Sequence, residues 1–326
     1  MGATLVTGAR GFTGAWLTKA LLDRGREVVR LERPAERRLS TLSLLGLEQR
    51  APQVRAELGD GPSLVRALRE HGVTDVFHLG AESIVGAVAE SPLSAFETNV
   101  RGTWTLLDAC LEARVERVVV ASSDKAYGAH AELPYREEFA LQPTTAYEAS
   151  KAAADIIART YAPAYGLAVA VTRFANTYGG GDLHFSRIVP EAVCAAIEGR
   201  APVLRSDGSP ERDFLYVEDA ADAYLAIGSA LDRADVRGEA FNAGGRRPYR
   251  VGDVVARIAE LAGTGVEPEV LGKGNPKGEI DRQFVDGTKI RERCGWEPAI
   301  DLDEGLRRTI GWYRAHPEAR PPGDDP

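Results

Sequence analysis

The first fourteen residues constrain the fold more than any other part of the chain. Ala3–Thr7 is a short apolar segment that leads into the sequence TGARGFTG at positions 7–14 and then into a helical stretch, Ala15–Arg24. A strand, a glycine-rich turn and a helix in this order are typical of the start of a dinucleotide-binding unit. Strand-like and helix-like segments then alternate to about residue 173. This pattern predicts an α/β fold of the Rossmann type, with a doubly wound parallel sheet and right-handed crossovers.

Each of the three positions in the turn requires glycine for a different physical reason. Gly8 permits a tight turn, Gly11 lets the backbone approach a pyrophosphate, and Gly14 allows close packing of helix on strand. The amides at the helix start, including those of Phe12 and Thr13, would face the phosphates. A glycine-rich turn without a ligand is the alternative, but the position between the first strand and the first helix favours a dinucleotide.

An acidic residue at the end of the second strand indicates which dinucleotide is bound. Glu32 follows the strand Glu27–Leu31 and can accept hydrogen bonds from the adenosine ribose hydroxyls, which favours NAD. Arg33, Arg37 and Arg38 follow closely, and they could instead bind a 2′-phosphate or simply lie solvated in a loop. NADP is therefore the less favoured cofactor.

Further cofactor candidates lie where the next two strands end. Asp60 follows the third strand and is placed to meet the adenine, and the segment 76–81 ends the fourth strand beside the cofactor. The full predicted cofactor set is Gly8, Gly11, Phe12, Thr13, Gly14, Glu32, Asp60, Gly61, Leu79, Gly80, Ala81, Asn99, Tyr147 and Lys151.

A phenol and an amine lie four residues apart on a helix predicted over Ala146–Tyr165, so Tyr147 and Lys151 share one helix face. A free phenol has a pKa of about 10, and a neighbouring ammonium lowers it. We expect Lys151, together with the positive ring of an oxidised nicotinamide, to lower the pKa of Tyr147. Tyr147 could then remove a proton from a substrate hydroxyl while hydride leaves the same carbon. A surface pair on an ordinary helix is the alternative.

The valine-rich segment Val115–Ala121 predicts a buried parallel strand whose polar end, Ser122–Lys125, lies at the carboxyl edge of the sheet. Ligands bind at that edge in open α/β sheets. We therefore predict a catalytic set at this edge that consists of Ser123, Asp124, Lys125, Tyr147 and Lys151.

These motifs together resemble the extended short-chain dehydrogenase/reductases of the nucleotide-sugar epimerase/dehydratase family. Further matches are the segments 78–81, 99–103, 173–179 and 212–219, so the resemblance runs from Thr7 to about Trp312. It implies an NAD-binding domain at residues 1–173 and a smaller mixed α/β domain at 174–316 that binds the nucleotide-diphosphate sugar. The chain is free to cross between the two more than once, and residues 317–326 are expected to form a flexible tail.

The resemblance also implies a homodimer formed by two helices, expected at Ser94–Ala113 and Ala146–Tyr165. The alternative is that Trp104, Leu107 and Leu111 face the protein's own core. The residues that it implies for the substrate are Ser83, Asn176, Arg187, Arg212 and Arg282, since arginine suits phosphate oxygens.

The pair Asp124-Lys125 resembles CDP-glucose 4,6-dehydratases, and the segments 15–17 and 180–182 point the same way. Such an enzyme oxidises C4, eliminates water across C5 and C6, and returns hydride to C6. We assign Asp124 as the acid and Lys125 as the base, with the reverse assignment or a structural ion pair as alternatives. The chain is shorter than expected for that enzyme, and its carboxyl-terminal stretches are more like those of epimerases.

Two other functions therefore stay open. One is a nucleotide-sugar 4-epimerase acting on a UDP-sugar, in which Asp124 and Lys125 only position the sugar. The other is a non-catalytic NAD-binding sensor on the same scaffold, because a fold alone does not fix function.

Composition narrows the classes of partner. A formal net charge of −8 over 326 residues gives no electrostatic case for nucleic-acid binding. No apolar run approaches the ~18 residues of a membrane span, and the start of the chain leaves no room for a signal peptide. The three cysteines are far apart, which favours reduced thiols in the cytoplasm, and no Cys/His cluster has the spacing of a metal site.

Overall fold

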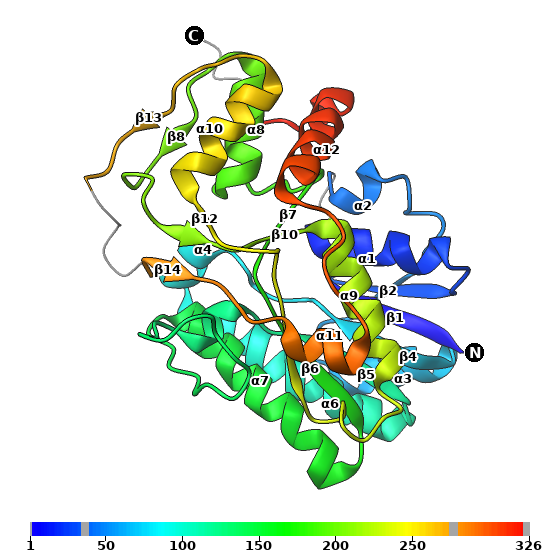
Figure 1. Cartoon of the computed structure of the whole chain (residues 1–326). Coiled ribbons are helices and arrows are strands. Elements are labelled where there is room, and N and C mark those ends of the chain that lie inside the picture. The colour runs from blue at the N-terminus through cyan, green and yellow to red at the C-terminus, as the bar shows by residue number, and fades with distance from the viewer. Residues whose placement is uncertain (1, 34–38, 274–279, 322–326) are drawn as a thin grey trace.

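The computed structural model describes residues 2–33, 39–273 and 280–321 (Figure 1). Its centre is a parallel sheet of seven strands in the order β11-β6-β5-β4-β1-β2-β3. The strands are β1 (Ala3–Thr7), β2 (Val28–Glu32), β3 (Gln53–Arg55), β4 (Val73–His78), β5 (Arg117–Ala121), β6 (Ala168–Phe174) and β11 (Ala240–Ala243). The order reverses next to β1, as in doubly wound dinucleotide-binding sheets. The predicted fold class is confirmed.

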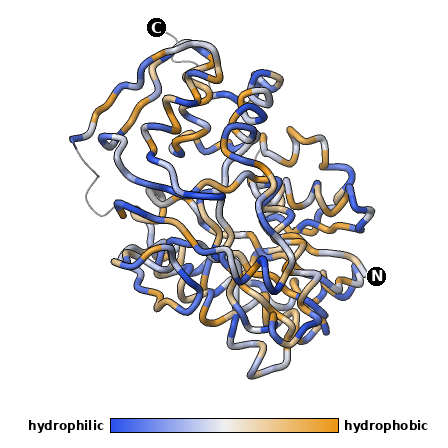
Figure 2. Tube along the Cα trace, viewed as in Figure 1, coloured by the Kyte–Doolittle hydropathy of each residue, from blue (hydrophilic) through white to orange (hydrophobic). Residues whose placement is uncertain are grey.

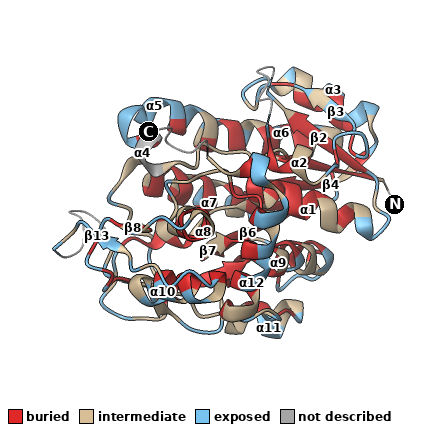
Figure 3. Cartoon of the chain, turned by 90° about the horizontal axis from the view of Figure 1, so that it is seen from above, coloured by how far each residue is buried: buried red, intermediate tan, exposed pale blue. Residues whose placement is uncertain are grey.

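Helices cover both faces of this sheet. One face carries α1 (Phe12–Asp23), α9 (Val217–Ala230) and α11 (Thr288–Cys294), and the other carries α3 (Gly61–Glu70), α6 (Gly102–Ala113) and α7 (Ala146–Tyr165). Neighbouring residues of a strand point to opposite faces, so Leu5 packs in one apolar cluster and Val6 in the other. Burial on both faces explains why the strands are continuously apolar, and they are largely red in Figure 3.

A second group of helices forms a smaller unit around its own apolar core. Its helices are α8 (Ile188–Glu198), α10 (Val251–Ala262) and α12 (Leu302–Ala315). Hydrophilic and hydrophobic residues alternate along α12 in Figure 2, because Leu306 and Ile310 are buried in this core while Arg307 faces solvent. The remaining strands are short and form three small sheets: β7 (Asn176–Tyr178) with β10 (Phe214–Tyr216), β9 (Glu211–Arg212) with β12 (Tyr249–Arg250) and β14 (Arg282–Gln283), and β8 (Val203–Leu204) with β13 (Glu269–Val270).

The path of the chain crosses between the two units more than once. After α8 the chain returns through α9 and β11 to the large sheet, and it then leaves again for α10. The remaining helices are α2 (Thr41–Leu44), α4 (Val85–Glu90), α5 (Pro92–Ala95), a π-helix (Phe96–Arg101), and two 3₁₀ helices (Asp124–Tyr127 and Pro317–Ala319).

Two elements differ from the sequence expectation. The single helix expected at Ser94–Ala113 is divided, because a π-helical turn at 96–101 precedes α6. The expected flexible tail begins with packed structure, since Pro317–Ala319 is helical and Ala319 is buried in the core of the smaller unit. Residues 322–326 lie outside the described part of the chain.

Candidate active site

The glycine-rich turn has the close backbone approach that a dinucleotide site requires. Gly8 has a φ of +70°, and a Cβ there would lie 2.8 Å from the backbone of Leu79 and Gly80. A Cβ on Gly14 would lie 2.2 Å from the Gly8 carbonyl oxygen, whereas Gly11 is exposed. Side chains are thus excluded where β1, the turn and α1 meet, and the amino end of the twelve-residue helix α1 is left accessible. The residues present fit a bound pyrophosphate.

A buried chain of hydrogen bonds fixes the loop after β4 against this turn. The Gly80 amide donates to Thr7 Oγ1 (2.8 Å), and Thr7 in turn contacts His78 Nδ1 (2.8 Å). His78 Nε2 lies 3.0 Å from Thr103 Oγ1. Burial lowers the pKa of His78 to about 3, so this imidazole is neutral at physiological pH. His78 therefore braces the predicted cofactor loop without carrying charge.

The end of β2 holds more charge than the sequence alone suggested. Glu32 is largely buried in an ion pair with Arg30, and Arg10 Nη1 lies 3.7 Å from its carboxylate. Arg33 pairs with Glu82 (3.0 Å). Arg37 and Arg38, the other candidates for a 2′-phosphate, lie outside the described residues.

Asp60 has a structural function that its position after β3 explains. Its carboxylate accepts a hydrogen bond from the Ser63 amide (3.2 Å) and so caps α3, which begins at Gly61. Contact of Asp60 with the adenine stays a prediction.

Helix α7 carries the phenol and the amine on one buried face, as predicted. It begins with a capping box in which Thr145 and Glu148 satisfy each other's backbone amides, and the left-handed residue Gly166 ends it. Tyr147 and Lys151 are both buried. The Lys151 ammonium donates to the carbonyl oxygen of Ala121 at the end of β5 (2.9 Å), which docks the helix on the sheet edge.

Asn99 connects α7 to the loop after β4. Its side-chain amide donates to Ser150 Oγ (2.9 Å) and to the Glu82 carbonyl (3.0 Å), and its carbonyl oxygen accepts from the Glu82 amide (2.7 Å). Asn99 is buried on the π-helical turn, a feature often found at functional sites. This geometry makes Asn99 a brace between two parts of the site, and its contact with the cofactor stays a prediction.

The polar residues after β5 form a short 3₁₀ helix that begins at Asp124. Ser123 caps it by accepting from the Lys125 amide (3.2 Å), and the Ser123 hydroxyl also contacts Asp124 Oδ1 (3.2 Å) and Tyr147. Ser123, Asp124 and Tyr147 therefore lie together, as predicted.

The Asp124 carboxyl group is unusual in two ways. It is 2 % exposed, and none of the described residues hydrogen-bonds its buried Oδ2 atom. Burial raises the pKa of Asp124 to about 6, although Lys125, Ser123 and Arg212 oppose the rise. A buried carboxyl oxygen without a protein partner is costly in a purely structural role, so this group is a candidate for contact with a ligand.

Lys151 is not among the groups that lower the pKa of Tyr147, and the joint effect expected of Lys151 and an oxidised nicotinamide stays a prediction. Burial raises the pKa of Tyr147, Asp124 adds to the rise, and the opposing groups are Arg187 and Ser123. Burial lowers the pKa of Lys151 to about 8. The sequence reveals the spacing of the pair, but the depth at which both groups are buried depends on the packing of α7.

Two of the predicted substrate arginines affect the pKa values of predicted catalytic residues. Arg187 opposes the rise in the pKa of Tyr147, and Arg212 opposes that of Asp124. Arg187 also pairs with Asp182 (3.0 Å), and Arg212 Nη1 donates to the Asp281 carbonyl (3.2 Å).

The other three predicted substrate residues have more ordinary surroundings. Arg282 is 59 % exposed and pairs with Glu211 (2.6 Å), as in an ordinary surface ion pair. Asn176 donates to the Asp213 carbonyl (3.2 Å), and Ser83 is half-buried in the loop after β4. Contact with substrate at these positions stays a prediction.

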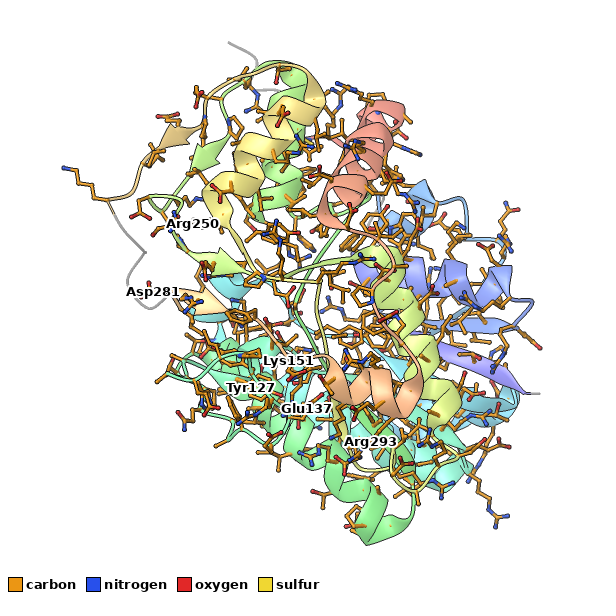
Figure 4. All side chains as sticks on the ribbon, in the orientation of Figure 1. Tyr127, Glu137, Lys151, Arg250, Asp281 and Arg293 are labelled. Carbon is orange, nitrogen blue, oxygen red and sulfur yellow. The ribbon has the colours of Figure 1, made fainter. Side chains whose placement is uncertain are left out.

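A buried network of an ion pair and hydrogen bonds lies beside the site, and the sequence alone did not predict it. Arg173 forms a two-pronged ion pair with Asp155 (2.7 and 2.9 Å) and donates to Tyr127 Oη (3.0 Å) and to the Glu137 carbonyl (3.1 Å). Figure 4 labels Tyr127, Glu137 and Lys151 in this region. Asp155 lies one turn beyond Lys151 on the same face of α7, and a carboxylate on an inward face requires a partner. The position of Asp155 on this face is therefore the feature of the sequence that could have indicated a buried basic partner.

Two further absences concern only the described residues. Across 2–33, 39–273 and 280–321 no group of three or more His, Cys, Asp or Glu side chains could hold a metal ion. No helix within the same part of the chain is long and apolar enough to cross a membrane.

A doubly wound sheet, a glycine turn that fits a pyrophosphate and the set Ser123, Tyr147 and Lys151 define an NAD-binding α/β enzyme of the short-chain dehydrogenase/reductase type. Comparison with known families identifies it further. Residues 4–244 match the NAD dependent epimerase/dehydratase family. The chain belongs to this family, whose relatives described below are enzymes, so the sensor interpretation is not retained.

Individual relatives cover almost the whole chain. It is 31% identical over 333 residues to a dTDP-glucose 4,6-dehydratase of Xanthomonas campestris, which spans 96% of this chain and 93% of the relative. It is 33% identical over 323 residues to a dTDP-glucose 4,6-dehydratase of Streptomyces antibioticus, spanning 95% and 92%.

Solved structures show both reaction types of the family. A UDP-glucose 4-epimerase of Thermotoga maritima with UDP-glucose superposes with a TM-score of 0.87 at 27% identity, covering 96% of this chain and 99% of that one. A dTDP-glucose 4,6-dehydratase of Bacillus anthracis in complex with NAD gives 0.85 at 28% identity, covering 98% of each chain. NAD is thus the cofactor of this enzyme class, and the reaction type is not separated by similarity of fold.

Proposed function

We propose that this enzyme is a nucleotide-hexose 4,6-dehydratase, with a CDP-hexose as the expected substrate. The observation that supports a dehydratase best is the buried Asp124 carboxyl group, whose Oδ2 atom has no hydrogen-bond partner among the described residues. The CDP assignment depends on the resemblance of the pair Asp124-Lys125, and the curated relatives quoted above act on dTDP-glucose.

Elimination of water from a hexose needs an acid and a base that epimerisation does not. Once C4 is a ketone, the C5 proton is acidic; a base removes it, and an acid protonates the departing C6 hydroxyl. Burial keeps part of the Asp124 population protonated near neutral pH, which suits the acid. Lys125 is the next residue, and its half-buried side chain is our candidate for the base.

The other residues of the site hold and orient the substrate. Tyr147 removes the proton of the C4 hydroxyl, Ser123 hydrogen-bonds the same oxygen, and Lys151 keeps α7 docked on β5. NAD, when bound by the Gly8–Gly14 turn and the Leu79–Ala81 loop, supplies the hydride acceptor and donor. Arg187 and Arg212 provide the positive charge that the diphosphate needs on an acidic protein.

An epimerase acting on a UDP-sugar is the second candidate. It is supported by the superposition on the UDP-glucose 4-epimerase of Thermotoga maritima. In that case Asp124 and Lys125 would only position the sugar.

Incubation with four classes of nucleotide sugar separates these functions. The purified enzyme with NAD is given CDP-, dTDP-, UDP- and GDP-hexoses, and the products are analysed by mass. A product lighter by one water supports the dehydratase and identifies its nucleotide. A product of unchanged mass with an altered proton NMR spectrum would contradict the dehydratase and support the epimerase.

Replacing Arg212 with glutamine should weaken substrate binding and leave cofactor binding unchanged. Loss of a charge-assisted hydrogen bond costs about 1.5–3 kcal/mol, or roughly 10- to 100-fold in KM for the nucleotide sugar. Calorimetry with NAD and with the nucleoside diphosphate measures both affinities. Arg250→Gln is the control, because Arg250 is an exposed arginine on β12, the strand paired with β9. Equal losses for both ligands would contradict the assignment.

The rate of water loss should fall as pH rises above about 6. Burial raises the pKa of Asp124 to about 6, so its acid form dominates below that pH and is lost above it. We expect kcat/KM to drop by about tenfold per pH unit on the alkaline side. Asp213 is the control, because burial raises its pKa to about 7. If the fall of kcat/KM above pH 6 disappeared in Asp213→Asn, Asp124 would not be the acid. The same would follow if kcat/KM of the wild-type enzyme did not change from pH 5 to 8.

We further propose a homodimer and a cytoplasmic location. Trp104 on α6 and Ile156 and Tyr165 on α7 are 41 %, 58 % and 62 % exposed, and apolar groups exposed on two adjacent helices favour a partner surface. Leu107 faces the protein's own core instead. The division into an NAD-binding domain at 1–173 and a nucleotide-sugar domain at 174–316 is likewise a proposal.

A further inference from the structure

The turn that follows β7 is held by the cofactor-binding unit. Trp16, in the second turn of α1, donates its indole N–H to the carbonyl oxygen of Gly180 (2.8 Å). Thr41, the first residue of α2, donates its hydroxyl to the carbonyl oxygen of Gly181 (2.6 Å). Both side chains are buried, and α2 and α12 lie above α1 in Figure 1. The backbone at 180–181 is therefore fixed by side chains from two helices of the first fifty residues.

The next residue is held from the other side. The Tyr313 hydroxyl on α12 donates to the carbonyl oxygen of Asp182 (2.6 Å). The Asp182 carboxylate is 1 % exposed, accepts the His184 amide (3.1 Å) and pairs with Arg187 (3.0 Å). The Gly180–Asp182 turn is thus a junction between α1, α2 and α12, and its one carboxylate holds Arg187.

The turn can be built only from glycine at its first two positions. A Cβ on Gly180 would lie 2.2 Å from the ring of Trp312. Gly181 has a φ of +91°, and a Cβ there would lie 2.7 Å from Thr41 Cγ2. Close approach of the backbone is what lets Trp16 and Thr41 reach their carbonyl acceptors.

Arg187 is held by Asp182 and remains partly exposed. Its side chain is 38 % exposed, so part of the guanidinium is free for a ligand while Asp182 holds the rest. Its charge also opposes the rise in the pKa of Tyr147, so Arg187 lies in the neighbourhood of that phenol. A guanidinium held on one side by a buried carboxylate loses less rotamer freedom when it binds a phosphate.

We propose that Asp182 is a positioning residue, and that Trp16 acts through it to set Arg187 for the substrate diphosphate. The amino end of α1 faces the cofactor site, and the same helix carries Trp16, so one helix orients both ligands. This inference rests on the proposed function, because it assigns Arg187 to the nucleotide sugar. Its distinctive consequence is that a residue of the cofactor-binding unit controls substrate affinity.

Two variants of the full-length enzyme with NAD test this role. Asp182→Asn removes the charge that holds Arg187, and Trp16→Phe removes the N–H donor while keeping an aromatic ring. Both should raise KM for the nucleotide sugar, and Kd for the nucleoside diphosphate, by about tenfold, the size expected for losing one partly exposed charged contact. The kcat and the Kd for NAD should stay within about twofold, a split that general loosening of the fold would not produce. Asp235→Asn, which removes an exposed carboxylate paired with Arg233, is the matched control.

The outcomes separate this inference from the function on which it rests. The positioning role alone would be overturned if both variants bound nucleoside diphosphate with wild-type affinity. It would also be overturned if they lost more affinity for NAD than for nucleoside diphosphate. A wild-type enzyme that neither converts a nucleotide sugar nor binds a nucleoside diphosphate would overturn the proposed function and this inference with it.

Discussion

Replacing Tyr147 with phenylalanine is expected to lower kcat by about 10²- to 10⁴-fold, the range for loss of a general base. Tyr147 is the phenol that contacts Ser123 at the end of β5, and we assign it the C4 hydroxyl proton of the substrate. Phenylalanine keeps the ring that packs against Val88 and Ala95, so stability should change little. Product mass gives the turnover rate, and absorbance of reduced nicotinamide in a single turnover reports the first oxidation.

The matched control is Tyr165→Phe at the far end of the same helix. Tyr165 is 62 % exposed, and loss of its hydroxyl should leave kcat unchanged. If Tyr147→Phe retained more than about a tenth of the wild-type kcat, the phenol would not be the base, and another group near Ser123 would have to take the proton.

Asp124→Asn and Lys125→Met should each abolish water loss while C4 oxidation continues. Asparagine keeps the shape of Asp124 but cannot protonate the C6 hydroxyl, and methionine keeps the length of Lys125 without a group that accepts the C5 proton. We expect a fall of about 10²- to 10⁴-fold in product that is lighter by one water. Single-turnover absorbance should still show reduced nicotinamide, and Kd for NAD should not change.

Solvent deuterium separates the two roles. If Lys125 is the base, Asp124→Asn should still exchange the C5 proton of the substrate for deuterium, whereas Lys125→Met should not. The opposite pattern would reverse the assignments of acid and base. Full turnover in both variants would contradict the dehydratase, and Lys19→Met, at a half-exposed lysine on α1, controls for loss of charge.

The features that could be predicted are those encoded in a short segment of the sequence. The turn at Gly8–Gly14 and the alternation of strands and helices are local patterns, and they led to the observed sheet. The four-residue spacing of Tyr147 and Lys151 likewise placed both groups on the buried face of α7.

Features that depend on contacts across the chain could not be found in this way. Trp16 and Gly180 are 164 positions apart, and nothing near either residue shows that they meet. The pKa of Tyr147 rises because burial outweighs the nearby protein charges, and burial is a property of the packed structure. The hydrogen bonds of the Asn99 amide to Glu82 and Ser150 likewise depend on contacts that its motif does not reveal.

The buried pair of Arg173 and Asp155 limits which substitutions evolution can accept at these two positions. Both side chains are at most 2 % exposed, and losing either one leaves an uncompensated buried charge, at a cost of about 3–5 kcal/mol. That single step would remove a large share of the stability of an ordinary domain, which is about 5–15 kcal/mol. An apolar pair could in principle replace both, but only if the two codons changed together. We therefore expect the two positions to be kept or replaced together in evolution, although they lie on a helix and a strand 18 residues apart.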